Sequence, residues 1–124
     1  MDWRAIDLFK GIDLNDSFVL DWNQKVDQLT FEIEASIWPD SKYYRTPKSD
    51  AYTCYRRASL IFASIKSCTG LLATEDVQAT NDPDGSKDYG NIDSLESHDG
   101  SFTITGEFGV VVIQGGELRF DVHT

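Results

Sequence analysis

The sequence predicts a mainly β fold, in which six to eight strands form a single antiparallel sandwich or a strongly curled sheet, with a short N-terminal helix. Three observations lead to this fold class. Residues 101–122 form the longest run of strand-forming residues, residues 17–34 alternate apolar and polar side chains in two arms, and glycine-containing turn signals separate the strands. With 124 residues and no visible linker, residues 1–124 are expected to form a single β-rich domain with its own core.

The first expected element is the short helix, over residues 2–10. The Asp2 side chain can cap its N-terminus, and Gly11 can end it. The apolar stripe of this helix is narrow and consists of Ala5, Ile6 and Phe9. We therefore expect a small lid on the sheet.

Residues 17–34 predict a β-hairpin with a four-residue loop at residues 24–27. The other face of this hairpin carries carboxylates, among them Glu32 and Glu34. Their spacing of two residues along a strand is typical of a solvated face and does not indicate a catalytic pair. The core face is expected to carry three cross-strand pairs, Trp22 with Leu29, Leu20 with Phe31, and Phe18 with Ile33.

The middle of the chain predicts a loop and then a buried strand. Residues 38–52 are rich in aromatic side chains and contain Pro39 and Pro47, which exclude an interior strand and indicate a long ordered loop or a flap. Residues 55–65 carry apolar side chains at both odd and even positions. This pattern is typical of a central strand that is covered on both faces.

The C-terminal third contains three turn signals. Residues 99–100, Asp-Gly, predict a type I′ turn that places Leu95 opposite Ile104. Gly106 and Gly109 interrupt the long run of strand formers, and the parity of the inward residues changes there, so we expect a bulge or a tight turn. Gly115 and Gly116 predict a further hairpin, with Ile113 opposite Leu118, Val111 opposite Phe120, and Gly109 opposite Val122.

The charge of the chain limits its partners. The sequence has 21 acidic and 11 basic residues and a net charge of −10. Because such a chain repels phosphates, neither nucleic acid nor an anionic membrane is expected as a partner, whereas a basic protein partner fits. Residues 42–66 differ, since six basic residues against Asp50 alone give this segment a net charge of +5 and leave −15 on the remainder.

Location and cofactors follow from what the sequence lacks. Residues after Met1 do not resemble a secretion signal, and no apolar run approaches the roughly 18 residues of a membrane span, so we expect a cytoplasmic protein. Cys54 and Cys68 have no second cysteine pair or histidine nearby, which excludes a zinc or CxxC motif and indicates two reduced, mostly buried thiols. No cofactor is expected.

The aromatic and basic segment 38–57 is the first candidate binding site. Aromatic faces and arginine side chains can stack on a sugar or a base, bind an anion, or contact a protein. The same residues can instead form a structural cover over one sheet face. The candidate residues are Trp38, Tyr43, Tyr44, Arg45, Tyr52, Arg56 and Arg57, with Tyr55 beside them.

The acidic loop 81–93 is the second candidate. It does not match an EF-hand, because Lys87 occupies the position of the invariant glycine and Asp93 that of the final glutamate. Asp, Asn, Gly and Pro are also the residues that turns require, so we expect a solvated loop, with a cation site as the alternative. The candidate binding residues of this loop are Asp82, Asp84 and Asp88.

Catalysis has no support in the sequence. His98 lies beside a predicted turn, His123 lies near the end of the chain, and no nucleophile, metalloprotease or nucleotide-binding motif is present. We therefore expect no catalytic residue.

Several segments together resemble a group of small bacterial β-rich proteins of unknown function. These segments are GIDLNDSFVLDW, LTFEIEASIWP, CYRRASLIF, DYGNID and FTITGEFGVVVIQGGELRF. More loosely, DSFVLDW, LIFASI and GEFGVVVIQGGELRF are similar to the layout of small immunity proteins of bacterial toxin systems. This resemblance implies a cytoplasmic bacterial protein that acts by binding.

The functional expectation is therefore a non-enzymatic, acidic binding domain, of the immunity type, that binds a basic protein partner. The alternative is a small-ligand or carbohydrate binder that uses the aromatic and basic segment 38–57. Oligomeric state is not predicted.

Overall fold

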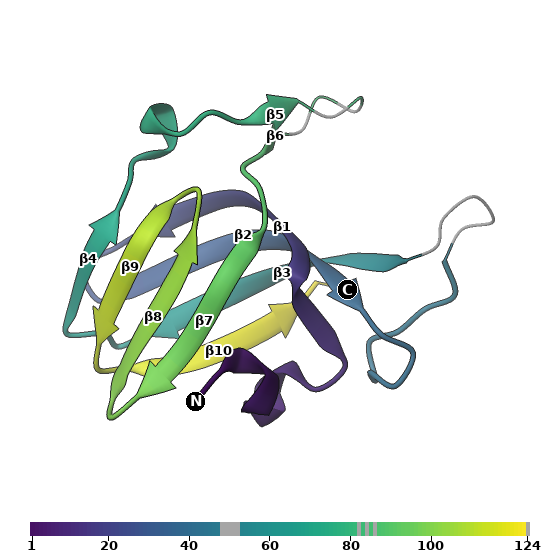
Figure 1. Cartoon of the computed structure of the whole chain (residues 1–124), viewed down its shortest axis with the longest axis horizontal. Helices are drawn as coiled ribbons and strands as arrows, with labels where there is room; N and C mark the ends of the chain where they lie inside the picture. Colours follow the sequence, from purple (N-terminus) through teal and green to yellow (C-terminus); the bar gives the residue numbers. More distant parts are fainter. Residues whose placement is uncertain (48–52, 82, 84, 86, 124) are drawn as a thin grey trace.

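The computed structural model describes residues 1–47, 53–81, 83, 85 and 87–123. In this part of the chain, ten strands form antiparallel sheets, and the helical structure consists of short 3₁₀ turns (Figure 1). The mainly β class is confirmed; the strand count exceeds six to eight, with two strands only two residues long. The elements are η1 (Trp3–Ala5), η2 (Asp7–Phe9), β1 (Ile12–Gln24), β2 (Gln28–Ile37), β3 (Cys54–Ala63), β4 (Ser67–Leu71), η3 (Thr74–Asp76), β5 (Thr80–Asn81), β6 (Lys87–Asp88), β7 (Ile92–His98), β8 (Ser101–Gly106), β9 (Gly109–Gln114) and β10 (Glu117–Val122).

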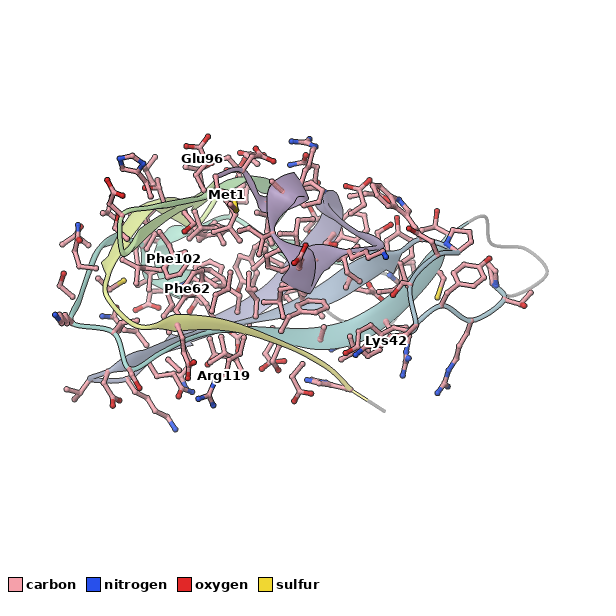
Figure 2. The ribbon with its side chains drawn as sticks, turned by 90° about the horizontal axis from the view of Figure 1, so that it is seen from below. Met1, Lys42, Phe62, Glu96, Phe102 and Arg119 are labelled. Atoms are coloured by element: carbon pink, nitrogen blue, oxygen red, sulfur yellow. The ribbon has the colours of Figure 1, made fainter. Side chains whose placement is uncertain are left out.

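Two four-stranded sheets enclose one core. The first sheet has the strand order β1-β2-β3-β10 and the second β4-β9-β8-β7, while β5 pairs with β6 alone. Figure 1 shows the strands of the second sheet running across those of the first. Figure 2 shows Phe62 and Phe102 between the two layers, and their ring centroids lie 5.4 Å apart.

Aromatic side chains fill the centre of this core. Phe31 from the first sheet and Phe108 from the turn between β8 and β9 have ring centroids 4.7 Å apart, and both are fully buried. Trp22 lies edge-on to Tyr89, with centroids 4.9 Å apart. Burying each such side chain stabilises the fold by about 1.5–3 kcal/mol.

The hairpin of β1 and β2 forms as expected, but its register differs from the predicted one. Trp22 lies opposite Phe31 and not opposite Leu29. The reason is the turn: the Lys25 amide donates to the Gln28 carbonyl at 2.7 Å, so two residues, 26–27, close the hairpin and not four. Loop length fixes the register of a hairpin, so this difference shifts every predicted pair.

A β-bulge changes the inward face of β1 part-way along the strand. Between Val19, opposite Ile33, and Asp21, opposite Glu32, β1 has one extra residue, Leu20. Val19 is therefore fully buried, while Leu20 and Phe18 are only half-buried. The prediction that Phe18 and Leu20 share the core face with Trp22 is wrong.

The turn at Gly115–Gly116 does not close a hairpin. β9 pairs with β4 and β8, whereas β10 pairs with β3 in the other sheet. Both glycines have positive φ, 74° and 86°, but their turn carries the chain from one sheet to the facing one. Val111 and Phe120 are still buried, because the inner faces of two packed sheets show the same alternation as one hairpin face. The predicted pairs Ile113–Leu118, Val111–Phe120 and Gly109–Val122 are therefore wrong.

The central position of β3 is confirmed, because this strand lies between β2 and β10. Only one of its faces is turned to the core. Tyr55 and Arg57 are exposed on the other face, and Ile61 is half-buried there. The expectation of cover on both faces is wrong.

The expected helix over residues 2–10 is replaced by the two turns η1 and η2. Asp2 caps the first turn as predicted, but Ile6 is extended between the turns and interrupts the helical backbone. Trp3 and Phe9 are the buried side chains of this segment. In the part of the chain that the structure describes, no helix is long and apolar enough to cross a bilayer.

The hairpins of the second sheet form as predicted. Leu95 lies opposite Ile104 across the turn at residues 99–100. A tight turn joins Gly106 to Gly109, which lie opposite each other. Both cysteines are free, Cys54 buried and Cys68 half-buried, and residues 38–47 form no strand, as expected.

Candidate functional site

The outer face of the first sheet carries aromatic side chains, of which Phe18 is half-buried and Tyr55 and Trp38 are exposed. The Phe18 ring of β1 and the Tyr55 ring of β3 lie 5.5 Å apart between centroids. Tyr55 is 37% exposed, and Trp38, just after β2, is 44% exposed. Glu34 and Arg57 face each other across β2 and β3 on the same side. We call the surface formed by Asp16, Phe18, Glu34, Trp38, Tyr55 and Arg57 the aromatic face.

The local sequence explains why these side chains point outward. Residues of a strand alternate between its two faces, so the buried Cys54 and Ala58 of β3 leave Tyr55 and Arg57 on the outer side. Phe18 joins them because of the bulge at Leu20. Alternation on β3 and a bulge on β1 thus bring the two rings together.

Asp16 reaches the aromatic face through an irregular stretch of β1. Between the pairs Asp13–Ser36 and Phe18–Glu34, β1 advances by five residues where β2 advances by two. The Ser17 hydroxyl holds this excursion, since it donates to the Asp13 carbonyl at 2.7 Å and accepts from the Ser36 amide at 3.0 Å. The extra chain length places the Asp16 carboxylate above β2.

Two hydroxyl groups converge on that carboxylate. Oδ2 of Asp16 accepts hydrogen bonds from Ser36 Oγ at 3.0 Å and from the Tyr55 hydroxyl at 3.1 Å. Burial raises the pKa of Tyr55 above its ordinary value, and the hydrogen bond to Asp16 and the charge of Asp16 raise it further. Tyr55 therefore remains a hydrogen-bond donor over the physiological pH range.

A hollow of about 160 Å³ adjoins this carboxylate. Its lining includes the aromatic side chains of Trp38 and Tyr44 and the polar residues Asp16 and Ser36. An aromatic surface with a carboxylate at its centre can receive the side chain of a lysine or an arginine, which stacks on a ring and pairs with a carboxylate.

The structure divides the residues of the predicted aromatic and basic segment into two groups. Trp38 and Arg57 are exposed and lie on the aromatic face, whereas Tyr43 and Tyr44 are half-buried and pack against the core. Tyr52 lies outside the described residues. The segment thus covers the core with Tyr43 and Tyr44 and exposes Trp38 and Arg57 for binding.

The arginines of this segment have different surroundings. Arg56 donates from Nη1 to the Tyr43 carbonyl at 3.2 Å and from Nη2 to the His123 carbonyl at 2.9 Å, so it joins the loop to the end of β10. The Arg45 amide donates to Cys54 Sγ at 3.5 Å, and residue Arg45 is exposed. Of the predicted arginines, Arg57 alone belongs to the aromatic face.

The described end of the acidic loop runs beside β1, where Asn91 forms a bridge with Phe18. Asp88 lies in β6, is half-buried, and accepts a hydrogen bond from the Gly90 amide at 2.7 Å, which is a turn contact. Asp82 and Asp84 lie outside the described residues. Among the residues that the structure describes, no group of three or more His, Cys, Asp or Glu side chains is placed to hold a metal ion.

Sequence reasoning missed Asp16, Phe18 and Ser36. Ideal alternation has no bulge and therefore predicts Phe18 in the core. Asp16 and Ser36 come from strands that meet only in the fold. The available signal was the polar run of residues 15–17, Asn-Asp-Ser, which breaks the alternation of apolar and polar side chains, since such residues often form hydrogen bonds to a nearby backbone.

A second polar cluster lies on the same outer face, formed by three side chains from β2, β3 and the residue after β10. Ser59 Oγ donates to the Glu32 carboxylate, at 2.8 and 2.9 Å from its two oxygens, and lies 2.8 Å from His123 Nε2. In a hydrolase triad the carboxylate accepts a hydrogen bond from the histidine and orients it, and the imidazole accepts a hydrogen bond from the serine hydroxyl. Here the Glu32 carboxylate accepts from the serine itself and lies 3.6 Å from the same imidazole nitrogen, Nε2, so it does not orient the histidine through its other nitrogen.

Comparison of the chain with protein-family models, with curated proteins and with solved structures yields no match. Function must therefore be inferred from the chemistry of the aromatic face.

Proposed function

We propose that the protein is a non-enzymatic binding domain that holds a basic segment of a protein partner on its aromatic face. The observation that carries this proposal is the pair of Phe18 and Tyr55 rings on the outer side of the first sheet. The Tyr55 hydroxyl donates a hydrogen bond to the Asp16 carboxylate beside them. An immunity-type protein, which acts by occupying a toxin, is one instance of such a domain.

The composition of the aromatic face supports a protein partner. Tryptophan, tyrosine and arginine are the residues most enriched where binding energy concentrates in protein interfaces. Trp38, Tyr55 and Arg57 supply one of each within a small area of sheet. The aromatic side chains provide apolar contact area at a low cost in side-chain entropy.

Charge supports a basic partner. The neighbouring pairs of β1, β2 and β3 add Asp21 and Glu32 to the outer face beside Glu34. The second sheet is different, because the central row of its outer face consists of Thr69, Val112, Thr103 and Glu96. The net charge of −10 adds long-range attraction for a positively charged partner.

The test is a selection of displayed peptides on the purified protein at 0.05 M salt. We expect enrichment of sequences that combine arginine or lysine with an aromatic residue. Tyr55→Ala and Asp16→Asn should each lower the affinity for the selected peptides by about tenfold. Thr103→Ala, on the outer face of the second sheet, is the matched control and should bind like the wild type.

Two outcomes would contradict the proposal. Peptides that lose affinity for Thr103→Ala but not for Tyr55→Ala would place the site on the second sheet. Selected peptides without basic residues, or with affinities unchanged at 0.5 M salt, where the Debye length is only about 4 Å, would refute the charge argument. Circular dichroism of each variant separates lost binding from lost folding.

A further inference from the structure

A groove of about 380 Å³ lies between η2 and residues 40–43, at a site distinct from the aromatic face. Its lining consists of Asp7, Leu8 and Lys10, residues 40–43, and Phe120 of β10. Figure 2 shows Lys42, one of its lining residues, below the N-terminal turns. The groove has a volume within the usual range of small-molecule sites, about 300–1,000 Å³.

The two walls of the groove are joined at one end. The Trp38 amide donates to the Gly11 carbonyl at 2.8 Å, and Gly11 packs so closely on Ser41 that a Cβ at Gly11 would lie 2.6 Å from the Ser41 Cβ. Ser41 is also fixed, because its amide donates to the Trp38 carbonyl at 3.0 Å. The groove is therefore preformed, which lowers the entropic cost of binding.

The floor of the groove is apolar. Phe120 is only 9% exposed and lies edge-on to Phe9, with ring centroids 5.6 Å apart. Leu8 is 39% exposed and Tyr43 is half-buried on opposite walls. A ligand that fills the groove would cover these apolar surfaces and displace water from them.

The rim of the groove carries both signs of charge. Lys10 and Lys42 contribute two ammonium groups, and Asp7 and Asp40 contribute two carboxylates, all on exposed residues. Within the described part of the chain, none of these four forms an ion pair within 4.0 Å. Lys42 Nζ lies 5.1 Å from the centre of the Tyr43 ring, over the groove wall.

We propose that this groove binds a small zwitterion with an apolar body, of the class of a free apolar or aromatic amino acid. The ligand ammonium would pair with Asp7 and Asp40, its carboxylate with Lys10 and Lys42, and its side chain would lie on Phe120. Each part of such a ligand meets a group of matching chemistry. A neutral ligand would leave the charged rim without a role, and a ligand of a single charge would meet two like charges.

The test uses L-phenylalanine as the probe and the full-length, ¹⁵N-labelled protein. Amide shifts in two-dimensional NMR spectra should move saturably with added L-phenylalanine at residues 7–10 and 40–43. N-acetyl-L-phenylalanine amide, which keeps the ring but has neither charge, is the matched control ligand and should bind at least about tenfold more weakly.

Variants separate the two charges of the ligand. Lys42→Gln and Asp40→Asn should each weaken L-phenylalanine binding by about fivefold or more, whereas Lys87→Gln, an exposed lysine of β6, should leave it unchanged. The spectra also report whether each variant is folded.

Three outcomes would overturn the proposal. Equal affinity for the neutral amide would make the groove a purely apolar site. Loss of binding in Lys42→Gln but not in Asp40→Asn would make its ligand a carboxylate and not a zwitterion. Shifts confined to other residues would rule out the site. The absence of saturable shifts up to 20 mM probe would also rule it out, because a Kd of about 20 mM is the weakest affinity of interest for a ligand of this size.

Discussion

Asp16 shows how one residue can organise a surface. Its carboxylate accepts hydrogen bonds from Ser36 and Tyr55, and the second of these bonds fixes the exposed ring of Tyr55 beside Phe18. A hydrogen bond to a charged acceptor contributes about 1.5–3 kcal/mol when it is shielded from water, and less at an exposed position such as this one. The main effect of Asp16 is therefore on the orientation of Tyr55.

The first prediction concerns Tyr55→Phe and alkaline pH. The pKa of Tyr55 is raised in the folded state above its ordinary value of 10.0. A group with a raised folded pKa stabilises the fold below its unfolded pKa, and this contribution is lost as pH rises through the folded pKa. The free energy of unfolding should therefore fall less steeply above pH 10, roughly, in Tyr55→Phe than in the wild type.

Urea unfolding of both proteins between about pH 8 and pH 11 measures this difference. Tyr55→Phe should also be less stable near neutral pH by about 1 kcal/mol, since it lacks the hydrogen bond to Asp16. Parallel pH dependences for the two proteins would contradict the surroundings assigned to Tyr55.

The second prediction concerns the two thiols. Burial raises the pKa of Cys68, so less of the reactive thiolate is present near neutral pH than in an unfolded chain. Iodoacetamide should modify Cys68 more slowly in the native protein than in urea, and Cys54, which is 6% exposed, should react more slowly still. Peptide mass spectrometry measures both rates. Native rates that equal the rates in urea would contradict the burial of these side chains.

The site was only partly predictable from the sequence at this scale. The aromatic composition of residues 38–57 indicated Trp38 and Arg57, because Trp and Arg are typical interface residues wherever they are exposed. Asp16 was not predictable, since it meets Tyr55 through an irregular strand, and hydrogen-bond partners 39 positions apart leave no periodic signal. The groove was unpredictable for the same reason, because η2 and residues 40–43 meet only in three dimensions.

At the scale of elements, alternation identified inward residues better than it identified strand partners. Val111 and Phe120 were correctly placed on the core side, yet their strands lie in different sheets. Two arms joined by a tight turn show the same alternation whether they pair edge to edge or face each other across a core. The turn at residues 99–100 was predicted correctly because the strands on both sides pair with each other.

The third prediction compares two glycines at turns. Gly116 and Gly100 have similar φ angles, 86° and 81°, but a Cβ at Gly116 would lie 2.4 Å from the Ala63 carbonyl oxygen, whereas a Cβ at Gly100 would have no heavy atom within 4 Å among the residues described. Gly100→Ala should cost about 1–2 kcal/mol from backbone strain alone. Gly116→Ala should cost about 3–4 kcal/mol, because the turn between the sheets must also shift.

Chemical denaturation of the two variants decides this comparison. Equal losses of stability would mean that the turn between β9 and β10 can shift to accommodate a Cβ at Gly116, despite its close contact with Ala63. A smaller loss for Gly116→Ala than for Gly100→Ala would be incompatible with β9 and β10 lying in facing sheets.

At the scale of the whole molecule, the two sheets are held together by aromatic side chains from elements distant in sequence. Phe108 is the clearest example, since it lies at a turn, is fully buried, and contacts both Phe31 and Trp22, with centroids 4.7 and 5.9 Å away. The mainly β class was predictable because such cores require alternating strands. The pairing of sheets was not, because it depends on which faces meet.

The fourth prediction follows from this arrangement. Phe108→Ala should lower the free energy of unfolding by about 3–5 kcal/mol, because the cavity would open between the sheets. Val112→Thr, at a half-buried position between the buried Val111 and Ile113, is the control and should cost less than about 1 kcal/mol. Urea unfolding of both variants measures the difference. A comparable loss at Val112 would show that the outer face of the second sheet is also packed.

The position of β10 has a consequence for synthesis on the ribosome. β3 ends at Ala63 and its partner β10 begins at Glu117, so residues 64–116, fifty-three in all, must emerge before the first sheet is complete. Until then the backbone of β3, with Leu60, Ile61 and Phe62, presents an open edge of the kind that pairs with other chains. A nascent chain that pauses before Glu117 is therefore expected to need a chaperone, whereas one that pauses after Val122 is not.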